Sequence, residues 1–174
     1  MWIVDTALKA RSDQNLPIRV GIVGAGFMCQ GLTNQIVNSI RGMHFQYPPA
    51  AESKLVRCTR GAILDIIVDL RPESPTYLEH VSVELNEDNM TALYVPERFA
   101  HGYQVLRDNT DTSYQVGEFY TPNAESGLRH DDPRLGLKWP LPVSVISSKD
   151  RAFRPLREVE DEVRLRMSLA MAAA

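Results

Sequence analysis

The stretch Leu55-Val56-Arg57-Cys58-Thr59-Arg60-Gly61-Ala62-Ile63-Leu64-Asp65-Ile66-Ile67-Val68-Asp69-Leu70 predicts two β-strands joined by a turn. The turn lies at Arg60-Gly61, where glycine gives the backbone conformations that other residues rarely adopt. Successive side chains of a strand point to opposite sides. The second strand therefore has two faces, with Leu64, Ile66 and Val68 on one, and Ile63, Asp65 and Ile67 on the other.

Further short strands follow this pair along the chain. The segment His80–Leu85 alternates apolar and polar residues and predicts a half-buried strand, and Ala92–Val95 predicts another that Pro96 ends. The segments Gly102–Leu106 and Ser113–Phe119 flank a polar loop and predict a hairpin. Strands of this length and spacing, with turn residues between them, indicate an all-β sandwich or barrel.

The two ends of the chain have a different character. The segment 5–14 predicts a short polar helix, and Ile18–Val23 predicts a buried strand that leads into Gly24-Ala25-Gly26. A helix is then predicted over Phe27–Ile40, and a C-terminal helix over Arg157–Met171. We accordingly divide the chain into a βα segment (1–40), an all-β domain (41–151) and a helical tail (152–174).

The first 43 residues resemble the start of an NAD-dependent oxidoreductase. In that unit a glycine turn leads into a helix whose N-terminus faces a pyrophosphate. However, Cys29 replaces the third glycine of the motif, and no second strand with an acidic residue for the ribose follows. We expect no NAD binding here, and expect the apolar faces of this segment to pack on the remaining chain or on a second subunit.

Length, charge and cysteine content exclude several classes of function. A chain of 174 residues fits one domain, and a net charge of −3 gives no electrostatic case for nucleic acid or an anionic membrane as partner. Cys29 and Cys58 form no CxxC motif, so two reduced thiols are expected. No apolar run reaches the length of a membrane span, and the N-terminus has no signal-peptide pattern. We expect a soluble, cytoplasmic protein.

A histidine and a lysine ten residues apart suggest carbonyl chemistry. His44 lies in Arg41-Gly42-Met43-His44-Phe45-Gln46, and Lys54 begins the segment Lys54-Leu55-Val56-Arg57. A histidine can remove a proton beside a carbonyl, and a nearby lysine can hold the negative oxygen that forms. By themselves, His44 fits equally a structural histidine of the core or surface, and Lys54 fits a solvated lysine at the start of a strand.

Later segments add to this pattern in a characteristic order. They are Val95–Tyr103, Phe119–Pro122, Asp131-Asp132-Pro133 and Lys149-Asp150. Together with Arg41–Gln46 and Lys54–Arg57 they resemble the dTDP-4-dehydrorhamnose 3,5-epimerase family, from about residue 41 to 151. The resemblance implies a cupin-type jelly-roll β-barrel, a nucleotide-diphospho-sugar substrate with a 4-keto-6-deoxy sugar, a homodimer, and neither a metal nor a nicotinamide cofactor.

The resemblance also implies catalytic roles. His44 matches the general base and Asp150 the carboxylate that orients it, while Lys54 matches the cation that stabilises the enolate. Tyr114 matches the acid that returns a proton to the opposite face of the sugar. Without the resemblance, Asp150 would be a solvated residue of a polar loop and Tyr114 a packing aromatic.

Six further residues match the binding site of the family. Arg41 matches a diphosphate contact, for which a planar guanidinium is suited. The positions that line the sugar or nucleotide site are matched by Gln46, Asp65, His101, Tyr120 and Glu125. Asp65 stands among apolar residues, and a buried carboxylate needs a partner, which Lys54, His101 or an arginine could provide.

A metal site is not indicated, because the four histidines include no HxH pair.

Three functions from different classes remain open. The N-terminal residues that normally clamp the nucleotide in the family have no match in residues 1–40. The chain can therefore be an active epimerase, a catalytically impaired protein that binds nucleotide sugars, or an NAD-binding fusion. Retention of His44, Lys54, Tyr114 and Asp150 favours the first.

Overall fold

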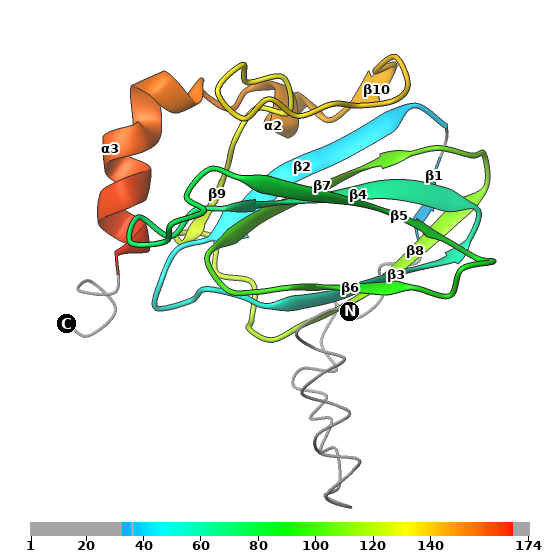
Figure 1. Cartoon of the computed structure of the whole chain (residues 1–174), viewed down its shortest axis with the longest axis horizontal. Coiled ribbons are helices and arrows are strands. Elements are labelled where there is room, and N and C mark those ends of the chain that lie inside the picture. Colours follow the sequence, from blue (N-terminus) through cyan, green and yellow to red (C-terminus); the bar gives the residue numbers. More distant parts are fainter. Residues whose placement is uncertain (1–32, 36, 169–174) are drawn as a thin grey trace, which may run out of the picture.

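The structure is a computed structural model that describes residues 33–35 and 37–168, and within this part it is mainly β. Figure 1 shows the arrangement of the elements. The strands are β1 (Thr33–Gln35), β2 (Ser39–Gln46), β3 (Lys54–Arg60), β4 (Ala62–Asp69), β5 (His80–Asn86), β6 (Ala92–Val95), β7 (Phe99–Val105), β8 (Thr110–Val116), β9 (Glu125–Gly127) and β10 (Val145–Ile146). The helices are α2 (Ser148–Arg151) and α3 (Leu156–Met167).

The strands form two sheets that lie one above the other (Figure 1). The smaller sheet has the order β1-β8-β3-β6, and the larger has the order β10-β2-β7-β4-β5, with β9 also paired to β2. The pairs are antiparallel except β10 with β2. The expected all-β, jelly-roll architecture is confirmed, in the form of two separate facing sheets instead of a closed barrel.

Strand β4 packs against apolar residues on both of its faces. Ile63 and Ile67 belong to the core between the sheets, together with Val56 and Cys58 of β3. Ile66 and Val68 belong to a second core on the outer side of the larger sheet, which α3 covers. The two faces expected from the alternation of residues 63–68 are thus confirmed.

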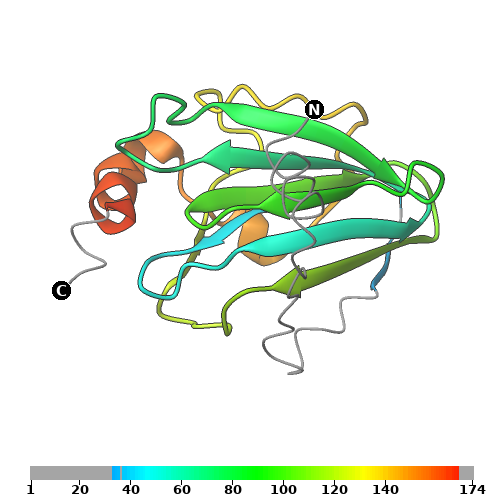
Figure 2. The ribbon, with the colours of Figure 1, turned by 60° about the horizontal axis from the view of Figure 1, so that its bottom comes forward.

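Helix α3 covers one end of the outer core. Its buried residues are Leu156, Val159, Val163 and Met167, a spacing that places them on one face of a helix. The helix ends at Met167, earlier than the predicted Met171, because Ser168 has an extended backbone. Figure 2 shows α3 at one end of the sandwich, beside the ends of the strands. None of the described helices combines the length and apolar character needed to span a bilayer.

The predicted helix over Phe27–Ile40 is wrong in its described part. Thr33–Gln35 forms strand β1, which pairs with Thr110–Thr112 of β8, and Ser39 and Ile40 already belong to β2. Pairing with a neighbouring strand therefore outweighs the helical spacing of apolar residues in this segment. The predicted helix over 5–14, the strand Ile18–Val23 and the glycine turn at 24–26 lie outside the described residues. The division of the chain at residues 40 and 151 stays a prediction, although β2 crosses the first boundary.

Most other predicted strands are confirmed with shifted ends. Strand β6 has the predicted bounds, whereas β7 begins at Phe99 instead of Gly102. Strand β8 covers Thr110–Val116 instead of Ser113–Phe119. The loop of this hairpin is shorter than expected because Thr110 is buried and its hydroxyl donates to the Arg107 carbonyl at 2.6 Å.

Candidate active site

A close approach of β2 and β7 places His44. The register of the two strands shifts between Arg41 and His44, and Gly42 has a φ of +117°. A Cβ atom added to Gly102 on β7 would lie 2.7 Å from the Arg41 carbonyl oxygen, so the two backbones can meet only because this residue is glycine. Beyond the shift, His44 stands directly opposite His101. The close approach of β2 and β7 therefore fixes the backbone of Arg41–His44. This close approach is called the crossing below.

Asp150 contacts His44 from a gap at the edge of β2. Strand β10 pairs with Ser39 and Ile40, β9 pairs with 44–46, and the Gly42 amide between them donates to Asp150 Oδ2 at 3.3 Å. The other oxygen, Oδ1, lies 2.6 Å from His44 Nε2. Ser147 caps α2 by accepting from the Asp150 amide at 3.0 Å, which fixes the helix that carries this carboxylate.

The Asp150 carboxylate is buried but remains favoured in its charged form. Its residue is 2% exposed, whereas the His44 side chain is 28% exposed. Burial raises the pKa of Asp150, but the contact with His44 and the hydrogen bonds from Gly42 and Ser147 outweigh it and lower the pKa below its usual value. The structure thus brings together the expected base and its expected orienting carboxylate.

A second histidine–carboxylate pair lies between the sheets. His101 Nε2 lies 2.5 Å from Asp65 Oδ1, and Asp65 is fully buried. Of the partners considered for Asp65, His101 is the one in contact. The second oxygen, Oδ2, is buried without a hydrogen-bond partner among the described residues. A buried oxygen without a hydrogen bond costs free energy. Since His44 faces His101, both pairs belong to the space between the sheets.

Lys54 and Tyr114 come from the opposite sheet. Lys54 shares a face of β3 with the buried Val56 and Cys58, and Tyr114 on β8 stands directly across from Val56. Tyr114 is half-buried and packs against the core between the sheets. The Lys54 ammonium lies 2.8 Å from Glu52. The predicted base and the predicted acid therefore belong to different sheets, and both face the space between them.

A chain of polar contacts extends the site from Asp150 toward Tyr120. The Tyr120 hydroxyl donates to Glu125 Oε2 at 2.6 Å, and Lys149, next to Asp150, lies 2.5 Å from Glu125 Oε1. Burial raises the pKa of Glu125, but Lys149 and Tyr120 outweigh it, so the pKa is lowered. The hydrogen bond to Glu125 in turn raises the pKa of Tyr120.

Two predicted binding residues have distinct surroundings. The Gln46 amide donates to the carbonyls of Ala50 and Phe119 and accepts from the Thr121 amide at 2.6 Å, so it holds the segment that carries Tyr120. Arg41 is exposed and, within residues 33–35 and 37–168, takes part in no ion pair.

The sequence alone did not single out three residues around the site. Lys149 binds Glu125, Glu52 binds Lys54, and the Phe153 ring packs edge-on against His44 with ring centroids 5.9 Å apart. A Cβ on Gly127 would lie 2.3 Å from the Phe153 ring, so glycine makes room for it. Lys149 could have been identified from the sequence, because it is next to Asp150. The contacts of Glu52 and Phe153 depend on the fold and could not.

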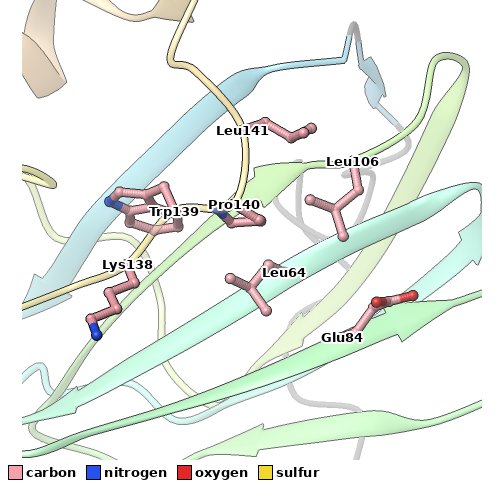
Figure 3. A pocket seen from close by; sticks show the side chains of 7 residues that line it. All are labelled: Leu64, Glu84, Leu106, Lys138, Trp139, Pro140 and Leu141. Atoms are coloured by element: carbon pink, nitrogen blue, oxygen red, sulfur yellow. The ribbon is translucent and has the colours of Figure 1, made fainter.

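One surface pocket lies on the other side of the larger sheet. It has a volume of about 460 Å³, and Figure 3 shows Trp139 and Pro140 above Leu64, with Lys138 and Glu84 on opposite sides of Leu64. Leu64 points away from the side on which Asp65 lies, so this pocket is on the outer side of the larger sheet. The expected catalytic residues His44, Lys54 and Tyr114 instead face the space between the sheets. No three His, Cys, Asp or Glu side chains of the described part could jointly hold a metal ion.

A family model and a curated relative that match this chain have the same description. The family model described as dTDP-4-dehydrorhamnose 3,5-epimerase matches residues 20–158, a longer range than the 41–151 covered by the motifs. The dTDP-4-dehydrorhamnose 3,5-epimerase of Sinorhizobium fredii is 45% identical over 124 residues, which are 71% of this chain and 64% of that protein. The chain thus spans less than two thirds of that relative.

Two solved structures share the fold. The dTDP-4-dehydrorhamnose 3,5-epimerase of Bacillus anthracis, with TDP and PPi bound, has a TM-score of 0.68 and 40% identity, with 70% of this chain and 69% of that chain covered. The dTDP-6-deoxy-D-glucose-3,5-epimerase of Legionella pneumophila, in complex with dTDP-4-keto-L-rhamnose, has a TM-score of 0.74 and 31% identity, with 88% and 79% covered.

Proposed function

The chain belongs to the dTDP-4-dehydrorhamnose 3,5-epimerase family, and on this basis we propose that it epimerises a nucleotide-linked 4-keto-6-deoxy sugar. The reaction removes a proton from a carbon beside the C4 ketone and leaves an enolate. A proton then returns to the same carbon from the other face of the ring. The protein must therefore supply a base, a stabiliser of the enolate oxygen, and an acid on the opposite side.

We propose His44 as the base and Asp150 as the group that orients it. An imidazole titrates near neutral pH and can accept a proton from carbon next to a carbonyl. The 2.6 Å contact between Nε2 and Asp150 holds the ring and favours the imidazolium that forms. Because Nε2 contacts the carboxylate, the other ring nitrogen is the one left for the substrate.

The enolate oxygen is proposed to lie near Lys54. Its side chain is only 12% exposed, and a positive charge in a site from which water is excluded stabilises a developing oxyanion by several kcal/mol, about 3 in typical cases. The ammonium is positioned before the substrate arrives, so little reorganisation is needed during the reaction.

The placement of Tyr114 carries the proposal. His44 belongs to the larger sheet and Tyr114 to the smaller, and both face the space between them. A sugar ring held there has one face toward the base and the other toward the phenol. This is the arrangement that inversion requires, because the returning proton has to approach the face that the base does not occupy.

The nucleotide and diphosphate are proposed to bind toward Arg41 and Tyr120. The Tyr120 ring is 46% exposed and is held by Glu125, so it offers a face on which a base can stack. The exposed Arg41 guanidinium is suited to phosphate oxygens. Two of the similar solved structures carry TDP or a dTDP-sugar, which supports a dTDP-linked substrate here. We further propose that the protein works as a homodimer.

The function can be tested by proton exchange in heavy water. The protein is incubated with dTDP-4-keto-6-deoxyglucose in D₂O, and deuterium at C3 and C5 is followed by NMR and mass spectrometry. We expect deuterium at one or both carbons together with inverted product. The sequence motifs did not identify the usual nucleotide clamp in residues 1–40, so the assay should include millimolar substrate. Absence of exchange at saturating substrate, with binding confirmed by calorimetry, would show a binding protein instead of an epimerase.

A further inference from the structure

We propose that Glu52 is a positioning residue that holds the Lys54 ammonium in place for the enolate oxygen. The proposal rests on the function given above, in which Lys54 stabilises the enolate. Its central observation is the distance of 2.8 Å between Lys54 Nζ and Glu52 Oε1. Each of the two side chains is 12% exposed, so this is a largely buried ion pair.

The protein holds Glu52 on a fixed loop. Residues 47–53 connect β2 to β3, and the Ser53 carbonyl accepts a hydrogen bond from the Gly117 amide at 2.8 Å. The Ala50 carbonyl accepts from the Gln46 side chain at 2.9 Å, and Ala51 is buried. The loop is thus fastened on both sides of Glu52, and the carboxylate is placed before any ligand binds.

Lys54 needs such a partner because its side chain is flexible. A lysine loses the rotamer entropy of its long side chain when it is ordered. Its stem lies on the same face as Val56 and Cys58, which are apolar and cannot fix the ammonium. Among the described residues Glu52 is the one carboxylate in an ion pair with Lys54. Asp65, which could have taken this place, is bound to His101.

The pair leaves the ammonium able to act. An ammonium has three N–H donors, and Glu52 occupies one, so two remain for a substrate oxygen. Electrostatic stabilisation is most effective when the donor is held in place before charge develops. Glu52 therefore contributes through the position of Lys54 and not through contact with the reacting atoms.

The kinetic test compares Glu52→Ala with Glu52→Gln. We expect Glu52→Ala to lower kcat for deuterium exchange roughly 10- to 100-fold, the size of effect that a small misplacement of a catalytic group produces, with little change in KM. Glu52→Gln keeps an oxygen that accepts from the ammonium and should retain most of the rate. Glu87→Ala removes an exposed glutamate whose amide donates to the Gly61 carbonyl, beyond the end of β3 opposite to Lys54, and serves as the matched control. Wild-type kcat in Glu52→Ala would overturn the proposal.

A double-mutant cycle separates positioning from general stability. If Glu52 acts only through Lys54, adding Glu52→Ala to Lys54→Ala should not lower the residual exchange rate further. A loss that multiplies in the double variant, or one that follows the fall in Tm, would instead assign Glu52 a structural role and contradict the proposal.

A measurement without substrate keeps this proposal separate from the function itself. The ammonium of Lys54 should give a ¹⁵N–¹H signal that exchanges slowly with water, identified by its loss in Lys54→Ala. We expect that signal to disappear in Glu52→Ala and to persist in Glu87→Ala. A persistent signal in Glu52→Ala would overturn the positioning role whatever the enzyme does. A wild type without exchange activity would overturn the proposed function, while this signal would still decide whether Glu52 holds Lys54.

Discussion

His44 and His101 stand opposite each other on neighbouring strands, but the carboxylates that contact them have different surroundings. Asp65 is fully buried beside His101, whereas Asp150 reaches His44 from a capped helix at the edge of the sheet. The lowered pKa of Asp150 keeps it negative at neutral pH, so it can stabilise an imidazolium on His44. His44 is also the more exposed histidine of the two. These contacts favour His44 over His101 as the base.

At the residue scale we predict that proton removal and proton return can be separated. Tyr114→Phe should leave deuterium exchange partly intact but block net inversion, because removal needs His44 while donation to the other face needs the phenol. Lys54→Ala should slow proton removal and proton return by about 100-fold, because both steps pass through the same enolate. NMR of exchange and of product stereochemistry in one sample measures both. Normal inversion by Tyr114→Phe would remove Tyr114 from the mechanism.

The sequence could link site residues that lie close together along the chain, but not those that lie far apart. His44 and Lys54 could be linked to carbonyl chemistry from their residue types, but Asp150 lies 106 positions from His44 and was assigned only by resemblance. The contact between Asp65 and His101 was one of several options, because the alternation places Asp65 on a face but does not choose its partner. The pair of Glu52 with Lys54 was not foreseen, since it depends on the path of the 47–53 loop.

At the scale of elements, the crossing of β2 and β7 should tolerate no side chain. In Gly102→Ala the new Cβ would meet the Arg41 carbonyl oxygen and the Met43 sulfur, each at 2.7 Å. We expect a loss of about 1–3 kcal/mol in the free energy of unfolding, and a lower exchange rate because His44 follows the crossing. Urea unfolding and the exchange assay check both.

A second glycine provides the control for this variant. Gly136 has a φ of +60°, a conformation that asparagine tolerates, and no atom lies within 4 Å of its added Cβ. Gly136→Asn should therefore cost less than about 1 kcal/mol of unfolding free energy, from backbone strain alone. Equal losses in the two variants would show that the close approach of the strands is not the cause.

The end of β4 should make the protein sensitive to acid. Burial raises the pKa of Asp69, but hydrogen bonds from Arg71, Ser74 and Thr76 outweigh it and lower the pKa well below its usual range. A depressed folded pKa gives stability that is complete above the unfolded pKa, about 3.9, and that is lost as pH falls toward the folded value.

We therefore predict a pH-dependent effect of Asp69→Asn. It should cost about 2 kcal/mol of unfolding free energy at pH 7, and the deficit should shrink as pH drops below about 4. Urea unfolding between pH 3 and 7 measures this, with Asp161→Asn on the exposed side of α3 as control. A deficit that stays constant over this range would contradict the assignment.

Elements with strict alternation were the predictable ones. The alternation in 62–70 gave both faces of β4, and Pro96 gave the end of β6. The helix predicted over Phe27–Ile40 was wrong for a physical reason. The spacing of a few apolar residues fits a helix, but it contains no information about the edge of β8 with which β1 pairs. The gap on β2 that admits Asp150 arises from β9 and β10, which are too short to be recognised by periodicity.

For the whole molecule, we predict a dimer that uses the outer side of the smaller sheet. Leu55 and Tyr94 are 43% and 47% exposed and stand directly opposite each other on β3 and β6. Apolar neighbours exposed together favour association. Light scattering at micromolar concentration should give twice the chain mass, and Tyr94→Glu should shift it toward monomer. Leu165→Glu, at a residue of α3 that is 61% exposed, should not. A wild-type monomer would contradict the prediction.

The measurement that tests the account most directly is deuterium exchange by His44→Ala beside the wild type, with dTDP-4-keto-6-deoxyglucose at saturating concentration in D₂O. The matched control is His80→Ala, which removes an exposed histidine at the start of β5. We predict exchange beside the ketone in wild type and in His80→Ala, and a loss of at least about 100-fold in His44→Ala at unchanged Tm. Exchange by folded His44→Ala at the wild-type rate would contradict the assignment of the base.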